Sequence, residues 1–191
     1  MSVLVVSTSL DPRSRSRLLA NFCLEDLREL GCEPSLLDLR ELQLPLFHND
    51  KVYGSAVVRD VWHRVFDAKG IVLTSPTYNW GCCSEPKSLI EITGSTDSKL
   101  GVHGAWNDKI LTFVNSAGLP RSYTAFGPLA LSMMLDYKCI INPYNIYVYD
   151  RQWLGQSVSG EPERRIRKSM KVMKELVQLL GNRTYPSAWE I

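Results

Sequence analysis

Short apolar runs alternate along this chain with longer stretches in which apolar residues recur at helical spacing. The runs are continuous and rich in β-branched residues and leucine, which is typical of parallel strands buried on both faces. They predict strands over residues 3–7, 35–39, 71–74 and 110–116, and a fifth strand region made of 139–141 and 146–149, interrupted at Asn142-Pro143. The helical spacing predicts helices over 18–30, 55–66, 85–92, 123–135 and 161–180, with Gly31 after the first and Gly181 after the last.

Five strand–helix pairs in alternation predict a doubly wound α/β fold, because parallel neighbours require helical crossovers. We expect a five-stranded parallel sheet in a three-layer α/β/α arrangement, forming one domain over residues 1–191. The strand order 2-1-3-4-5 is preferred to 3-2-1-4-5. It places the switch point between strands one and three, so the loops that follow these strands meet at one crevice.

The turn after the first strand is rich in hydroxyl and basic side chains. It reads Ser7-Thr8-Ser9-Leu10-Asp11-Pro12-Arg13-Ser14-Arg15-Ser16-Arg17 and leads into a helix. Backbone N–H groups at a helix N-terminus, hydroxyl donors and arginine side chains together favour a phosphate group. The turn has neither a glycine-rich dinucleotide pattern nor a Walker ending. An alternative is that Ser14 only caps the helix and the arginines are solvated.

Two further loops are expected at the same edge of the sheet. Ser75-Pro76-Thr77-Tyr78-Asn79-Trp80-Gly81 follows the third strand, and Asn115-Ser116-Ala117-Gly118 leaves the fourth. An aromatic residue, an amide and a proline-fixed turn at a strand's carboxyl end suit a flat polar ring. The alternatives are that Tyr78 and Trp80 are core or interface aromatics and that Asn79 only forms the turn.

Composition restricts the class of partner. With 22 basic and 20 acidic residues the chain has a formal charge of +2, and no basic face for nucleic acid is expected. No apolar stretch approaches the roughly 20 residues that span a bilayer, and the apolar run at the N-terminus is too short for a signal peptide. These observations predict a cytoplasmic protein with no membrane span and no nucleic-acid partner.

Cysteine and histidine usage argues against a disulfide framework and against a metal centre. The five cysteines are odd in number and lack paired CxxC spacing, and the three histidines lie far apart. Cys82 and Cys83 lie beside the second loop, but adjacent cysteines rarely reach relaxed disulfide geometry, so packing is preferred to a redox role. No acid–base pair or nucleophilic triad can be argued from spacing, and no catalytic side chain is assigned.

The three loops, in this order, resemble those of the NADPH-dependent FMN reductase family of flavodoxin-like proteins. That family shows a Gly-Ser-x-Arg-x-x-Ser-type turn, a Pro-x-Tyr-Asn loop with a lysine in the next helix, and a small-residue loop bearing glycine. The counterparts here are Thr8 to Ser16, Pro76 to Asn79 with Lys87, and Ser116 to Gly118. One departure is Asp11, which stands where an arginine is common, so that Arg13 or Arg15 is left to pair with the phosphate.

The resemblance implies a flavodoxin-like fold and an FMN site. Ser9, Ser14, Ser16 and either Arg13 or Arg15 would bind the phosphate. The ring would lie between Pro76, Thr77, Tyr78, Asn79 and Trp80 on one side and Ser116, Ala117 and Gly118 on the other.

The activity that the resemblance implies is hydride transfer from NADPH or NADH through FMN to a small acceptor, such as free flavin, a quinone or an azo compound. A flavodoxin-like electron carrier and a non-catalytic FMN-binding module are the alternatives. A homodimer or homotetramer is expected, because aromatic residues that we expect to be exposed crowd the C-terminal quarter: Tyr144, Tyr147, Tyr149, Trp153 and Trp189.

Overall fold

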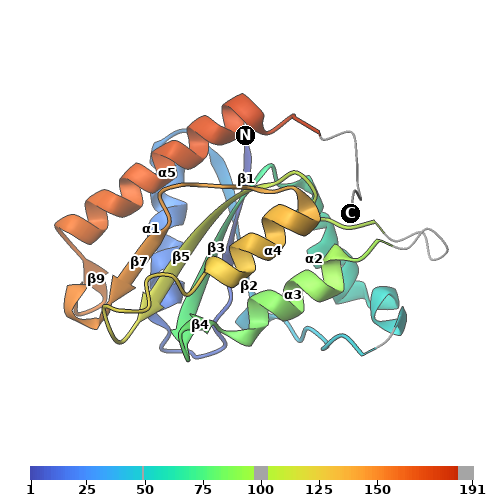
Figure 1. The fold of residues 1–191 in the computed structure, drawn as a ribbon, viewed down its shortest axis with the longest axis horizontal. Helices are drawn as coiled ribbons and strands as arrows, with labels where there is room; N and C mark the ends of the chain where they lie inside the picture. The colour runs from blue at the N-terminus through green and yellow to red at the C-terminus, as the bar shows by residue number, and fades with distance from the viewer. Residues whose placement is uncertain (49, 97–102, 185–191) are drawn as a thin grey trace.

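The computed structural model describes residues 1–48, 50–96 and 103–184, and these form a twisted sheet between two layers of helices (Figure 1). The strands are β1 (Ser2–Ser7), β2 (Glu33–Asp38), β3 (Gly70–Tyr78), β4 (Gly81–Cys82), β5 (Ile110–Ala117), β6 (Ile140–Ile141), β7 (Ile146–Tyr149), β8 (Trp153–Leu154) and β9 (Ser157–Val158). The α-helices are α1 (Arg15–Glu29), α2 (Ala56–Asp67), α3 (Ser84–Gly94), α4 (Gly127–Tyr137) and α5 (Glu161–Leu180). Short 3-10 turns cover Leu39–Glu41, Asp50–Gly54 and Asp150–Gln152.

The main sheet is parallel and has the order β2-β1-β3-β5, with β6 and β7 both pairing with the far side of β5. The fifth strand is thus split in two, as the Asn142-Pro143 break predicts. Asn142 stabilises the break, because its buried side-chain amide donates to Thr112 Oγ1 at 2.9 Å and to the Ser169 carbonyl at 3.1 Å. The order 2-1-3-4-5 is therefore confirmed.

Each face of the sheet has its own core. Alternate residues of β1 separate cleanly: Val3 and Val5 pack beneath α1 and α5, whereas Leu4 and Val6 face α2, α3 and α4. Figure 1 shows the same division, with α1 and α5 on one side of the sheet and the other three helices on the opposite side. The continuous apolar runs of the sequence are the consequence of this two-sided burial.

Several expected boundaries are shifted, and two of them are wrong by four residues. The strand expected at 71–74 is β3, which continues to Tyr78, because Ser75 and Pro76 still pair with Asn115 and Ser116 of β5. The helix expected from Tyr123 starts at Gly127, where Pro128 occupies the first turn. The segment before it is held as turns by Tyr147, whose hydroxyl donates to the Leu119 carbonyl and accepts from the Ser122 N–H.

The expectation of an exposed aromatic cluster in the C-terminal quarter is also wrong in part. Tyr147 and Trp153 are buried inside the chain. Tyr144 is exposed and its ring lies 4.1 Å from Lys168 Nζ, whereas Trp189 lies outside the described residues. Within the described part of the chain, no helix combines the length and the apolar character needed to cross a bilayer.

Candidate functional site

The register of the sheet brings four chain segments to one edge. Ser7 of β1 is opposite Thr74 of β3, and Pro76 of β3 is opposite Ser116 of β5. On the far side of β5, Ala117 is opposite Tyr149, the last residue of β7. Because parallel strands end at the same edge, the segments that follow β1, β3, β5 and β7 all reach the crevice at the switch point.

A cleft of about 480 Å³ lies at this edge, a volume typical of small-molecule sites. Eleven of the thirteen residues expected at the site line it: Ser9, Arg13, Ser14, Arg15, Ser16, Pro76, Thr77, Tyr78, Ser116, Ala117 and Gly118. Asn79 and Trp80 are not among its lining residues. Two carboxylates, Asp11 and Asp150, complete the lining.

The turn after β1 is organised around Asp11. The Ser14 N–H donates to the Asp11 carbonyl at 3.1 Å, which closes a β-turn over Pro12 and Arg13. The Asp11 carboxylate accepts the Arg13 N–H at 2.8 Å, and the Asp11 N–H donates to Ser9 Oγ at 3.3 Å. The acidic side chain therefore stabilises the loop, which explains how it is accommodated at the edge of the cleft.

The start of α1 keeps its donors available. Ser14 precedes the helix with extended backbone angles, but its hydroxyl makes no capping bond and lies 2.7 Å from Ser16 Oγ instead. No acidic residue occupies the first turn. The positive end of the helix dipole and the first-turn N–H groups are thus left for an anion beside two hydroxyls. The alternative in which Ser14 serves only as a cap does not agree with this geometry.

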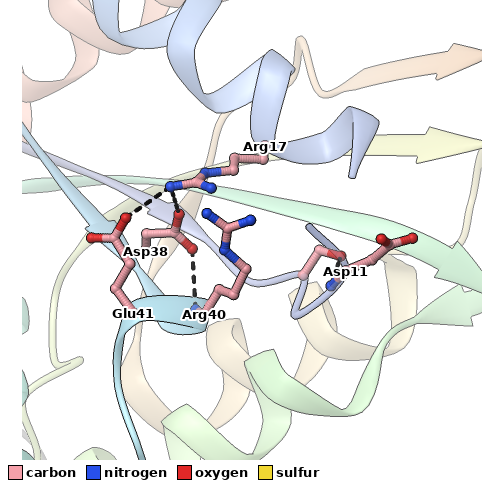
Figure 2. Close-up of polar contacts among 6 residues, drawn as sticks. Asp11, Arg17, Asp38, Arg40 and Glu41 are labelled. Carbon is pink, nitrogen blue, oxygen red and sulfur yellow. Dashed lines mark hydrogen bonds and ion pairs between the residues drawn. The ribbon is translucent and has the colours of Figure 1, made fainter. Parts of the chain in front are cut away.

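The three arginines of the turn point in different directions. Arg13 is 91% exposed, and its Nε lies 4.0 Å from Asp11 Oδ1. Arg15 forms an ion pair with Asp150 and lies over the Trp153 ring at 5.4 Å. Arg17 turns away to the end of β2, where Nη2 contacts Asp38 at 2.5 Å and Glu41 at 2.9 Å, at a distance from Asp11 (Figure 2). A single anion is therefore not surrounded by all three guanidinium groups.

Asp38 anchors this neighbouring cluster. Its side chain is only 1% exposed, and its second oxygen accepts the Arg40 N–H at 3.1 Å. Burial raises the pKa of the Asp38 carboxyl, and the nearby Arg17 charge offsets part of that increase. The pair joins the start of α1 to the end of β2 and so fixes the helix whose N-terminus faces the cleft.

The second loop is a tight hairpin. β4 pairs antiparallel with the end of β3, with Tyr78 opposite Gly81, so that Asn79 and Trp80 form a two-residue turn. Both have positive φ, 49° and 67°, as a type I′ turn requires. Asparagine tolerates this conformation, whereas tryptophan rarely adopts it. Tyr78 is 54% exposed and Trp80 65% exposed, so the hairpin presents two aromatic rings to solvent beside the cleft.

A buried polar layer supports the hairpin from below. Cys83 Sγ lies 3.3 Å from both Thr8 Oγ1 and Ser75 Oγ, and the Cys83 N–H donates to the Pro76 carbonyl at 3.2 Å. Burial raises the pKa of the Cys83 thiol to about 11, and it raises that of Cys82 as well. Both cysteines are free thiols. Protonated, hydrogen-bonded thiols agree with the packing role preferred above.

One residue named from the sequence lies outside the cleft lining, and one lining residue was not predicted. Lys87, the counterpart of the family lysine, is exposed on α3 and pairs with Glu91 at 2.6 Å, one turn along the helix. Asp150 was missed. The signal that could have found it is its place directly after the fifth strand region, since the same rule identified the other three loops.

The model of the family described as NADPH-dependent FMN reductase matches residues 1–127. No curated protein matches the sequence significantly. Solved structures do resemble the fold. An apo NADH:FMN oxidoreductase, EmoB, superposes with a TM-score of 0.73 at 13% identity, covering 98% of this chain and 92% of that one.

Two other structures give similar results. FerB, an NAD(P)H:(acceptor) oxidoreductase from Paracoccus denitrificans, has a TM-score of 0.72 at 17% identity, with 94% and 98% of the two chains covered. An archaeal flavodoxin has a TM-score of 0.57 at 9% identity, with 92% and 99% covered. At these identities the likeness establishes a shared flavodoxin-like fold.

Proposed function

Because this chain belongs to the NADPH-dependent FMN reductase family, we propose that its cleft binds FMN, accepts hydride from NADPH or NADH, and reduces a small planar acceptor. Family membership makes the chain an FMN-dependent NAD(P)H oxidoreductase. The finer proposal concerns the residues that hold FMN and the acceptor: free flavin, a quinone or an azo compound. The observation that carries it is the single cleft in which the start of α1 meets the loops after β3 and β5.

The α1 end of the cleft suits the phosphate. Ser9, Ser14 and Ser16 supply hydroxyls there, and the uncapped start of α1 supplies backbone N–H groups. Such donors, together with the helix dipole, favour a dianion without a lysine. We assign the phosphate to this end, with Arg15 as the arginine within reach of the cleft and Arg13 at its solvent side.

The other end suits a flat heteroaromatic ring. Pro76, Thr77 and Tyr78 form one wall, and the small residues Ser116, Ala117 and Gly118 form the other. Thr77 Oγ1 is buried without a hydrogen-bond partner. A buried hydroxyl that lacks a partner carries an energetic cost. The polar edge of an isoalloxazine ring would remove that cost, and this supports the assignment of the ring to this wall.

When bound, FMN supplies the hydride chemistry itself. The chain's own residues need to bind and orient the ring, leave one side of it open, and exclude competing positions of the donor. No protein acid or base is assigned, and none is required for that role. The two substrates are proposed to occupy the same open side in turn, because Tyr78 lines the cleft and exposes its ring, and Trp80 exposes a second ring two residues later in the same hairpin.

We also propose a homodimer or homotetramer. Leu131, Met134 and Leu135 lie at positions i, i+3 and i+4 of α4, and each is about half exposed or more. An apolar stripe of this kind on a helix is an unusual surface for a monomer. We assign it to contact with a second copy of the chain, in place of the C-terminal aromatics.

Steady-state turnover tests the proposal. NADPH and NADH oxidation is measured with catalytic FMN and, separately, with excess free FMN, a benzoquinone and an azo dye as acceptors. The proposal expects acceptor-dependent oxidation of the nicotinamide. The alternative, a single-electron carrier, predicts bound flavin with negligible turnover of either nucleotide. The formal charge of +2 argues against a carrier, because such proteins are usually acidic around the flavin.

A further inference from the structure

The cleft contains an ion pair between two of its own lining residues. Arg15 begins α1, Asp150 follows β7, and their side chains contact through Nη1 and Oδ1. They come from the two segments farthest apart in sequence among those that form the cleft. Neither segment needs the pair in order to fold, since α1 packs through its own buried face and β7 through its pairing with β5.

The position of Arg15 is determined from the β7 side. The Trp153 ring lies 5.4 Å from its guanidinium carbon, and Asp150 supplies its ion-pair partner. Both partners belong to the segment that follows β7. The Ser14 and Ser16 hydroxyls meanwhile bond to each other, 2.7 Å apart. The guanidinium is thus held by a carboxylate and an indole, and the hydroxyls are held by one another.

The other two arginines of the turn do not replace Arg15. Arg17 is committed to Asp38 and Glu41 (Figure 2), and Arg13 is almost fully solvated. Arg15 is therefore the arginine whose pairing decides how much positive charge the phosphate end of the cleft offers to an anion. While Asp150 is paired with Arg15, the guanidinium charge is neutralised and the Asp150 carboxylate lies beside it in the cleft. A phosphate that enters this end competes with the Asp150 carboxylate for Arg15 and is repelled by that carboxylate.

We propose that Asp150 sets the affinity of the protein for FMN by competing with the FMN phosphate for Arg15. This inference rests on the FMN site proposed above. Both side chains are substantially exposed, 41% for Arg15 and 59% for Asp150. Exposed ion pairs are weak, so a dianionic phosphate can displace the carboxylate. The consequence is a flavin that exchanges readily.

The test compares FMN with riboflavin, which has the same ring and no phosphate. Dissociation constants are measured by quenching of flavin fluorescence at fixed ionic strength. Asp150→Asn should bind FMN more tightly, by roughly five- to tenfold, and riboflavin within a factor of about two of the wild type. Arg15→Gln should weaken FMN binding, and in the Arg15→Gln background Asp150→Asn should give a smaller gain, because only the repulsion between the carboxylate and the phosphate is then removed. Asp150→Ser serves as a second removal of the carboxylate.

The matched control is Glu25→Gln. It also removes one negative charge, from an exposed pair with Arg28 on the same helix, and its residue does not line the cleft. It should leave both affinities unchanged. An unchanged ratio of FMN to riboflavin affinity in both Asp150 variants would overturn the inference, and so would weaker FMN binding, which would mean that Asp150 orients Arg15 toward the phosphate. Failure of the wild type to bind either flavin would instead overturn the proposed site itself.

Discussion

At the scale of single residues, backbone strain marks the tip of the β3–β4 hairpin. Trp80 has a φ of 67° and projects a largely exposed indole. A glycine at this place in a type I′ turn would avoid the steric cost, which is on the order of 1 kcal/mol for a bulky residue. The tryptophan therefore destabilises the turn, and we expect its indole to contact the planar acceptor at the open side of the proposed ring site.

Trp80→Gly separates these two effects. The free energy of unfolding should rise by about 0.5–1 kcal/mol because the turn is relieved. The KM for the planar acceptor should rise several-fold because an aromatic contact is lost. Chemical denaturation and steady-state kinetics measure the two quantities. Asn79→Gly is the matched control in the same turn, and it should change the KM little. A less stable Trp80→Gly protein with an unchanged acceptor KM would contradict this account.

At the scale of elements, the Arg17–Asp38 pair fixes the start of α1 against the end of β2. Arg17→Met keeps the apolar stem but leaves a buried carboxylate without its partner. Breaking such a pair costs about 2–4 kcal/mol of unfolding free energy at neutral pH. The matched control is Arg28→Met, which removes an exposed pair from the same helix and should cost less than about 0.5 kcal/mol.

The destabilisation of Arg17→Met should depend on pH, because it arises from the ionised Asp38 carboxylate. The folded-state pKa of Asp38 is raised by burial, and it should rise further without Arg17. A carboxyl with a raised folded-state pKa binds its proton more tightly in the folded protein, so its penalty is present at neutral pH and declines as pH falls through that pKa. Chemical denaturation should therefore show that Arg17→Met loses less unfolding free energy, relative to the wild type, near pH 5 than at pH 7. An equal deficit at both pH values would contradict the assignment.

The elements also show what the sequence could predict. Strands buried on both faces produce unbroken apolar runs, so β1, β3 and β5 were identifiable and the switch point followed from their order. Of the two-residue strands in the described part of the chain, β6 lies in the predicted apolar run at 139–141, whereas β4, β8 and β9 are too short to produce a period and were not predicted. The start of α4 was misplaced because Tyr147, distant in sequence, determines the turns before it. Asp150 directly follows the fifth strand region, so the rule that identified the other three loops could have found it as well.

At the scale of the whole molecule, the surface of α4 predicts assembly. Leu135→Glu, in the exposed stripe with Leu131 and Met134, should reduce the mass measured by light scattering. Placing a charge in an apolar interface leaves it desolvated and unpaired. Leu179→Glu is the control, because Leu179 is an even more exposed leucine on α5, outside the stripe. A wild-type protein that is monomeric at micromolar concentration, or an unchanged mass in Leu135→Glu, would exclude this interface.

The two ends of the cleft are proposed to serve one function. Hydroxyls and a helix N-terminus at one end, and small and aromatic walls at the other, are expected to hold the phosphate and the ring of a single ligand. Neither end is sufficient alone. The reaction of the bound flavin with a nicotinamide can therefore be observed directly.

The most direct measurement is an anaerobic absorbance titration of the FMN-saturated protein with NADPH, repeated with NADH. The account predicts that the flavin band bleaches in proportion to the nucleotide added and reaches completion at one equivalent. It also predicts that the band returns on addition of a quinone. A band that persists with both nucleotides, at a concentration where FMN is bound, would show that the bound flavin does not accept hydride from a nicotinamide.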